Sequence, residues 1–253
     1  MRNIMQTIVV AAAVVTLPSG LIPATQPEPQ QPAPVIDTVS SRAAKTVEGS
    51  PAAHDAWDPS TALGMTRPPK RVDYWIERFT GDQRKSFATY LARMDSFAPL
   101  IESKLDERGM PHDLLYLAMI ESGFNPLAQS PAKAKGLWQF VEATAERYGL
   151  TVTGKVDERV DPEKSTEAAL TYLSDLYERF GSWYLAAAAY NSGENRVARV
   201  MRTVTGSERG TDADFDAIAS HLPKETREYV PRIVAAARIA EQPEKYGFTG
   251  GKS

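Results

Sequence analysis

Residues 110–126 read MPHDLLYLAMIESGFNP, and this stretch decides the fold class. Pro111 suits the first turn of a helix, where its missing N–H needs no partner. An almost unbroken apolar run follows and ends at Glu121, and the next two residues, Ser122-Gly123, should end the helix. The stretch therefore predicts an apolar helix with a single carboxylate in its last turn.

Helical spacing continues on both sides of this stretch, through residues 71–246. The spacing i, i+3, i+4 and i+7 is shown by Phe87, Tyr90, Leu91 and Met94. Asp161-Pro162-Glu163 is a strong helix start, and the pattern that it opens runs to Gly181. Only residues 150–157 suggest β-structure, in the form of a small hairpin. We therefore expect residues 71–246 to form one mostly α domain.

The two ends of the chain differ in composition from this domain. Residues 1–24 combine Arg2, an apolar run and Ala24 at a plausible cleavage position, which predicts a secretory signal. The apolar run is about half of the roughly 20 residues that a membrane-spanning helix needs. Residues 25–70 hold eight of the 18 prolines, which predicts a disordered linker. We expect residues 247–253 to be a flexible tail.

Composition excludes several classes of protein. With 29 basic and 32 acidic residues the net charge is −3, whereas a nucleic-acid binder normally has a basic face. Cysteine is absent, which excludes a disulfide scaffold, a thiol nucleophile and a zinc–thiolate site. The three histidines lie far apart in the sequence, so no His-x-x-x-His metal pair exists. We expect neither a metal nor a cofactor.

Glu121 is the strongest candidate for chemistry. Its carboxylate should be partly desolvated by the apolar run and should lie at the negative end of the helix dipole. Both effects favour the protonated form and raise the pKa, as a general acid near neutral pH requires. The alternative is a surface glutamate at a frayed helix end.

Other polar residues have structural explanations when each is taken alone. Gln139 lies in the apolar end of SPAKAKGLWQF, residues 130–140, and needs a hydrogen-bond partner, as a satisfied core amide would. Asn191 could be a helix C-cap, and Tyr190 could be a core residue with its hydroxyl at the rim. None of these residues identifies a site without the others.

Together these segments form an ordered pattern of four motifs. The motifs are Glu121-Ser122, Gly136-Leu137-Trp138-Gln139, Ala189-Tyr190-Asn191 and Glu225-Thr226-Arg227-Glu228-Tyr229-Val230. The pattern resembles the lysozyme-like lytic transglycosylases, which cleave peptidoglycan. Residues 110–126 look closest to the branch of membrane-bound lytic murein transglycosylase D.

The resemblance implies a lysozyme-like (SLT) catalytic domain with a deep groove for a glycan strand. It implies that Glu121 is the single acid and base, and that Tyr190 is hydrogen-bonded to it. Ser130 matches the family serine beside the active site, which is expected to contact the N-acetyl region of the sugar.

The resemblance also implies roles for the remaining motif residues. Gln139 and Asn191 match groove residues that bind the glycan. Glu225 and Tyr229 match a late motif that lines the far wall of the groove. Ser122 is expected to support the end of the helix rather than touch the substrate.

The reaction expected from this resemblance is non-hydrolytic. No Asp or Glu occurs between Glu121 and Glu142, where goose-type lysozymes carry aspartates that help a water attack. One carboxylate would then cleave the bond between N-acetylmuramic acid and N-acetylglucosamine and leave a 1,6-anhydro end. One alternative is a muramidase whose second acid is Asp157, Glu158 or Asp161, and another is a peptidoglycan-binding protein without activity.

The same reasoning gives expectations about location and partners. A signal segment before an enzyme of this kind predicts export to the periplasm, with a tether to the membrane if the segment is not cleaved. We expect a monomer whose partner is the peptidoglycan glycan strand, and no nucleic acid.

Overall fold

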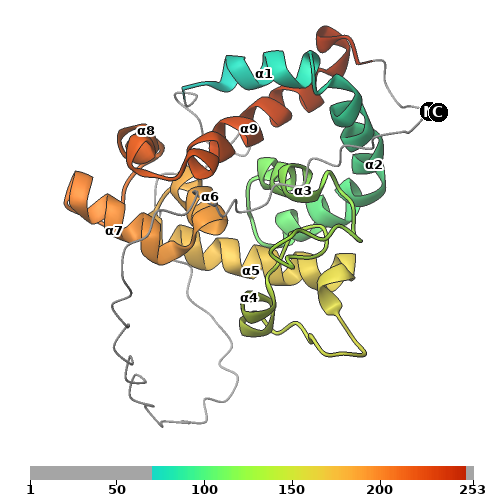
Figure 1. Cartoon of the computed structure of the whole chain (residues 1–253), viewed down its shortest axis with the longest axis horizontal. Helices are drawn as coiled ribbons and strands as arrows, with labels where there is room; N and C mark the ends of the chain where they lie inside the picture. The colour runs from blue at the N-terminus through green and yellow to red at the C-terminus, as the bar shows by residue number, and fades with distance from the viewer. Residues whose placement is uncertain (1–69, 249–253) are drawn as a thin grey trace, which may run out of the picture. The chain divides into compact units, whose positions relative to one another are not determined.

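The computed structural model describes residues 70–248, which fold into packed helices joined by short loops (Figure 1). The α-helices are α1 (Val72–Thr80), α2 (Arg84–Glu107), α3 (Leu115–Ser122), α4 (Glu142–Arg147), α5 (Pro162–Phe180), α6 (Trp183–Ser192), α7 (Glu194–Thr205), α8 (Asp212–Ile218) and α9 (Lys224–Glu241). Short 3₁₀ turns are found at His112–Leu114, Glu158–Val160, Ala219–His221 and Pro243–Tyr246. The expected signal, all of the expected linker except Lys70, and residues 249–253 lie outside the described residues.

The mostly α fold class is confirmed. Between residues 70 and 248 no strand forms, and β-structure is limited to isolated antiparallel bridges. One bridge joins Val152 to Asp157, so the hairpin expected at residues 150–157 is reduced to a single pair. No helix of this part of the chain has the length and apolar content that crossing a bilayer requires.

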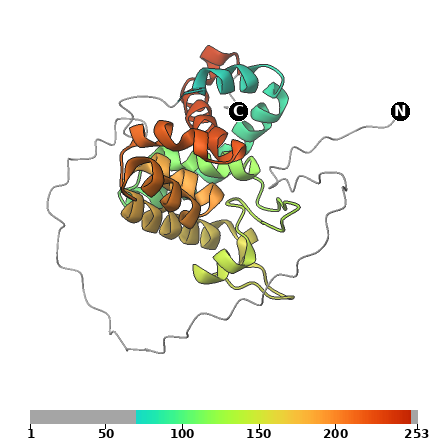
Figure 2. The same ribbon diagram turned by 60° about the vertical axis from the view of Figure 1, so that its left-hand side comes forward.

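Helix α9 connects the two sides of the domain. It packs against α1, α3 and α6, and α6 packs in turn against α5 and α7. Figures 1 and 2 both show α9 running alongside α1. Because α3 and α6 carry the first and third motifs and α9 carries the fourth, this packing brings motifs far apart in sequence to one place.

Helix α3 is enclosed by its neighbours. Every residue from Leu115 to Ile120 is buried, as the apolar sequence requires. The helix ends at Gly123, whose left-handed conformation (φ 58°) lets its N–H donate to the carbonyl of Met119 at 2.9 Å. A Cβ at this position would lie 2.2 Å from the ring of Tyr90, so only glycine fits. The left-handed cap at Gly123 therefore ends α3 at Ser122, so Glu121 lies in its last turn.

The bounds predicted for α5 are confirmed. The Asp161 carboxylate accepts from the backbone N–H groups of Glu163 (2.9 Å) and Lys164 (3.0 Å), which is a side-chain N-cap. The helix ends at Gly181 in the left-handed region.

The folded domain extends further than expected at its C-terminal end. The sequence predicts a flexible tail from residue 247 onwards, yet Phe248 is only 6% exposed. Its ring lies 5.5 Å from that of Phe87, centroid to centroid, and the guanidinium of Arg84 lies over it at 4.6 Å. An aromatic residue that finds an apolar partner buries its ring, which local composition does not reveal.

Candidate active site

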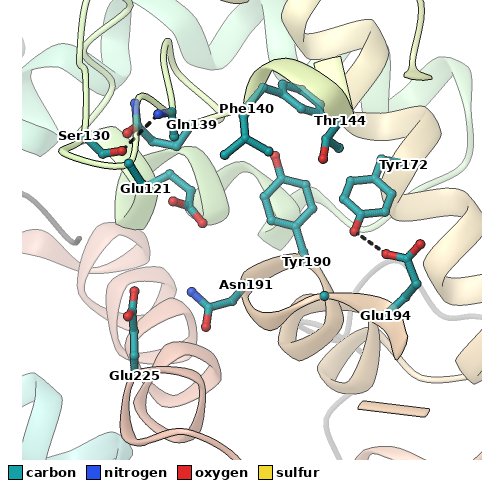
Figure 3. A pocket seen from close by; sticks show the side chains of 14 residues that line it. Glu121, Ser130, Gln139, Phe140, Thr144, Tyr172, Tyr190, Asn191, Glu194 and Glu225 are labelled. Atoms are coloured by element: carbon teal, nitrogen blue, oxygen red, sulfur yellow. Dashed lines mark hydrogen bonds between the residues drawn. The ribbon is translucent and has the colours of Figure 1, made fainter. Parts of the chain in front are cut away.

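A cleft of about 320 Å³ opens beside the C-terminal end of α3 (Figure 3). It brings together six of the eight residues that the sequence singled out, which are Glu121, Ser130, Gln139, Tyr190, Asn191 and Glu225. Figure 3 shows the Glu121 carboxylate pointing into the cleft, with Asn191 and Glu225 on the opposite side. Groups of three or more metal-binding side chains do not occur within residues 70–248.

The Glu121 carboxyl group is held by one strong hydrogen bond. The hydroxyl of Tyr229, on α9, donates to its Oε1 atom at 2.6 Å. Burial raises the pKa of Glu121 to about 7, although the Tyr229 bond and the positive charge of Arg232 act against this and the nearby Glu225 adds to it. A carboxyl group that titrates near neutral pH can both give and take a proton.

The expected bond between Tyr190 and Glu121 is not formed. The Tyr190 hydroxyl donates instead to the backbone carbonyl of Trp138, at 2.8 Å. A buried carbonyl needs a partner, and Tyr190 supplies it. Tyr229, for which the resemblance implies a place on the far wall of the groove, holds the carboxylate, and Tyr190 binds the loop between α3 and α4.

The loop between α3 and α4 forms one wall of the cleft and is braced by its own side chains. The Ser130 hydroxyl accepts from the N–H of Ala134 at 3.0 Å, and Ser130 is buried. The Gln139 amide donates to the carbonyls of Ala128 (3.2 Å) and Gly136 (2.9 Å). Gln139 itself is in the left-handed region (φ 50°). Both motif residues thus shape the wall as well as face the cleft.

Two further motif residues lie behind the wall. The Ser122 hydroxyl donates to the carbonyls of Ala118 (3.1 Å) and Leu137 (2.9 Å), so it links the end of α3 to the loop. Trp138 is fully buried, and its indole N–H donates to the Thr166 hydroxyl at 3.0 Å. Trp138 therefore anchors the loop in the core rather than lining a subsite.

The end of the cleft away from Glu121 is formed by residues that sequence reasoning missed. Tyr172 of α5 packs against Tyr190 with 5.2 Å between ring centroids, and its hydroxyl donates to Glu194 at 2.9 Å. Arg147 donates to the other oxygen of Glu194 at 2.8 Å, and Phe140 and Thr144 complete this end. In the sequence, Tyr172 follows the apolar spacing of α5 and carries no signal that separates it from a core residue.

The acids that a muramidase would need are engaged elsewhere. Asp157 pairs with Arg159 and with Lys135, each at 2.8 Å, and these cations hold the pKa of its carboxyl group well below the usual range. Glu158 binds the Lys164 ammonium group, and Asp161 caps α5. None of the three lines the cleft described above.

Comparisons with known proteins identify the proteins to which this chain is similar. Residues 99–212 match the model of the family described as the transglycosylase SLT domain. The chain is 39% identical over 156 residues to membrane-bound lytic murein transglycosylase D of Escherichia coli K12, covering 61% of this chain and 34% of that protein. It is 33% identical over 125 residues to the soluble lytic murein transglycosylase of the same strain, covering 47% of this chain and 19% of that protein.

A crystal structure of the 70 kDa soluble lytic transglycosylase of Escherichia coli covers 74% of this chain and 33% of that chain, with 19% identity and a TM-score of 0.49. The chain spans about a third of the length of the transglycosylase D relative. The resemblance drawn from the sequence motifs is confirmed, because residues 99–212 are similar to the transglycosylase SLT domain and the relatives are lytic murein transglycosylases.

Proposed function

We propose that the chain is a peptidoglycan lytic transglycosylase that cleaves the β-1,4 bond between N-acetylmuramic acid and N-acetylglucosamine without water. The observation that carries the proposal is Glu121, a half-buried residue whose partly desolvated carboxyl group has a pKa of about 7, in a cleft of a domain similar to the SLT family. The names of its relatives, which are lytic murein transglycosylases, support the same substrate class.

The proposed reaction uses Glu121 twice. The protonated carboxyl group donates its proton to the glycosidic oxygen, and the bond from that oxygen to C1 of the muramic acid breaks. The N-acetyl oxygen of the same sugar stabilises the positive charge at C1, as in substrate-assisted enzymes. The Glu121 carboxylate then takes the proton of the sugar's 6-hydroxyl, and O6 bonds to C1. The product is a 1,6-anhydro end, and no water or cofactor is consumed.

The geometry around Glu121 suits both halves of this cycle. Burial favours the protonated form that begins the reaction, and the Tyr229 hydroxyl favours the carboxylate that remains after proton donation. We assign the binding of the glycan to Ser130, Gln139 and Asn191, which line the cleft near Glu121.

The test is the mass of the fragments released from purified peptidoglycan by the purified protein. We expect muropeptides about 18 Da lighter than hydrolytic products, because O6 replaces water as the nucleophile. Ordinary reducing ends would instead support a muramidase. Retention on insoluble peptidoglycan without any release would support a binding protein that has lost activity.

Glu225 tests whether a second carboxylate takes part. It lines the cleft, and its carboxylate makes no hydrogen bond or ion pair with other residues of the described range. Under the one-carboxylate mechanism, Glu225→Gln weakens substrate binding but leaves the 1,6-anhydro product unchanged. Chromatography and mass spectrometry of the products check this. A loss of turnover as complete as that of Glu121→Gln would indicate a two-carboxylate mechanism.

Tyr229→Phe should change the pH dependence of the reaction. Loss of the donated hydrogen bond raises the pKa of Glu121 further, because that bond favours the ionised form. Since the reaction begins with protonated Glu121, the alkaline limb of the kcat/KM profile moves to higher pH, and turnover falls about tenfold because the carboxylate is poorly placed. Tyr190→Phe is the matched control, because its hydroxyl bonds to Trp138. An alkaline limb that moves in the control and not in Tyr229→Phe would contradict this assignment.

We further propose that the enzyme acts in the cell envelope, where peptidoglycan lies. The apolar N-terminal segment with Arg2 supports export, and the names of the relatives, one membrane-bound and one soluble, fit such a location. We also propose that the protein acts as a monomer and that its partner is the glycan strand.

A further inference from the structure

Trp75, on α1, contacts two neighbouring side chains of α9. Its indole N–H donates to Glu228 at 2.7 Å, and the guanidinium carbon of Arg232 lies 5.1 Å from the centroid of its ring. Glu228 and Arg232 are four residues apart, so they lie on one face of the helix. Arg71 pairs with the same Glu228 carboxylate at 2.7 Å. Helix α1 therefore holds α9 over one full turn.

Arg232 also continues the row of α9 that is turned towards the active site. Glu225, Tyr229 and Arg232 are spaced i, i+4 and i+7, which places them on one helical stripe. Glu225 lines the cleft, and Tyr229 donates to Glu121. The positive charge of Arg232 interacts electrostatically with Glu121, although no ion pair within 4 Å joins the two among residues 70–248. Arg232 therefore lies where two faces of α9 meet, the face that contacts α1 and the face that is turned towards Glu121.

The guanidinium of Arg232 is partly withdrawn from solvent and only partly compensated. Its Nε atom is buried and has no hydrogen-bond partner among residues 70–248. Burial lowers the pKa of Arg232, the direction expected when a cation loses water. Buried charges are normally paired with an opposite charge in direct contact. The face of the Trp75 ring offers a cation–π contact that offsets part of this cost.

We propose that Trp75 and Arg232 form a second support for Glu121, in which Trp75 covers the guanidinium and keeps its positive charge on the side of α9 turned towards the carboxylate. Arg232 is a positioning residue in this arrangement, because it acts on Glu121 through space and through its place beside Tyr229. Both residues lie outside residues 99–212, the part that matches the SLT family. Helix α1 is then a functional part of the active site.

Every charged group near Glu121 bears on this inference. The titratable groups that face Glu121 or the end of α3 are Glu225, Tyr229 and Arg232 of α9, Tyr190 of α6, and Tyr90 and Arg93 of α2. Burial raises the pKa of Glu121, whereas the Tyr229 hydrogen bond and the positive charge of Arg232 lower it. Without Arg232, only the Tyr229 bond remains, so Glu121 should hold its proton to a higher pH.

The test is a direct titration of Glu121 in the purified protein. The δ-carbons of glutamate are labelled with ¹³C, and the Glu121 signal is assigned by its absence from Glu121→Gln. We expect the midpoint of Arg232→Gln to lie about one pH unit above that of the wild type. Arg232→Lys keeps the charge and should stay close to the wild type. Arg238→Gln removes an arginine six residues further along the same helix and should leave the midpoint in place.

A folded Arg232→Gln protein with an unchanged midpoint would overturn the proposal. If Arg232→Gln does not fold, Trp75→Leu decides: it removes the ring that covers the guanidinium, and the midpoint should again rise, whereas Trp75→Phe keeps an aromatic face and the wild-type midpoint. An unchanged midpoint in Trp75→Leu would overturn it. The inference that the charge of Arg232 serves catalysis rests on the proposed function, but the titration of Glu121 needs no substrate. Hydrolytic products would contradict the proposed reaction but would not change the titration result. An unchanged midpoint would contradict the role of Arg232 but would not change the products.

Discussion

Glu121→Gln should abolish the release of soluble fragments from peptidoglycan, with turnover reduced by about 10³-fold or more. The amide keeps the shape of the side chain and can still accept the Tyr229 hydrogen bond, but it cannot donate a proton to the glycosidic oxygen. The loss is measured as fragments released per unit time from purified peptidoglycan. Glu142→Gln is the matched control, because Glu142 is the next acid along the chain and is exposed. Substantial turnover by Glu121→Gln would contradict its role as acid and base.

The same variant makes a second prediction, about stability. Glu121 has a pKa of about 7 in the folded protein and 4.5 as its ordinary value. A group whose folded pKa is raised contributes stability that is present below the ordinary pKa and is lost as the pH rises to the folded pKa. As the pH rises from 4.5 to 7, the free energy of unfolding of the wild type should therefore fall by on the order of 3 kcal/mol relative to that of Glu121→Gln. Urea unfolding of both proteins at pH 5 and pH 8 measures this difference.

Gly136→Ala should damage both the fold and the cleft. Gly136 is in the left-handed region (φ 84°), and an added Cβ would lie 1.8 Å from the backbone carbonyl oxygen of Arg159. Backbone strain and steric overlap together should lower the free energy of unfolding by about 3 kcal/mol or more. The Gly136 carbonyl also accepts from the Gln139 amide at 2.9 Å, so the wall of the cleft would shift and turnover would fall.

Gly149→Ala separates the two causes. Gly149 has the same φ of 84°, but no atom lies within 4 Å of the position that a Cβ would take. It should therefore show the backbone strain alone, about 1 kcal/mol, and keep its activity. The two variants are compared by urea unfolding and by fragment release. Equal losses of stability would show that contact with Arg159 is not what makes Gly136 necessary.

Much of the fold follows from local sequence. Asp161-Pro162 and Gly181 mark the ends of α5 correctly, because capping and left-handed glycines act over a few residues. The apolar run before Glu121 gives a buried helix with the carboxylate in its last turn. What local sequence does not contain is the partner of Phe248, since burial of an isolated aromatic depends on a surface more than 150 residues away in the chain.

The candidate site, like the fold, could be predicted from the sequence only in part. Ordered motifs locate Glu121 and most of the cleft, but the family resemblance that they carry names the wrong tyrosine, because Tyr229 and not Tyr190 donates to Glu121. The Tyr190 hydroxyl bonds to the loop carbonyl of Trp138, whereas the packing of α9 against α3 directs the hydroxyl of Tyr229, 108 residues away, to Glu121. Tyr172 and Arg232 carry no local signal, because their spacing within a helix is that of ordinary core and surface residues.

The central claim is that the sugar's own O6, and not water, attacks C1. Digestion of purified peptidoglycan in H₂¹⁸O tests it most directly, because only hydrolysis transfers solvent oxygen to the new end. We predict that the released muropeptides carry no label and have the mass of 1,6-anhydro ends. Fragments about 2 Da heavier than the same products made in ordinary water would show that water is the nucleophile and would contradict the account.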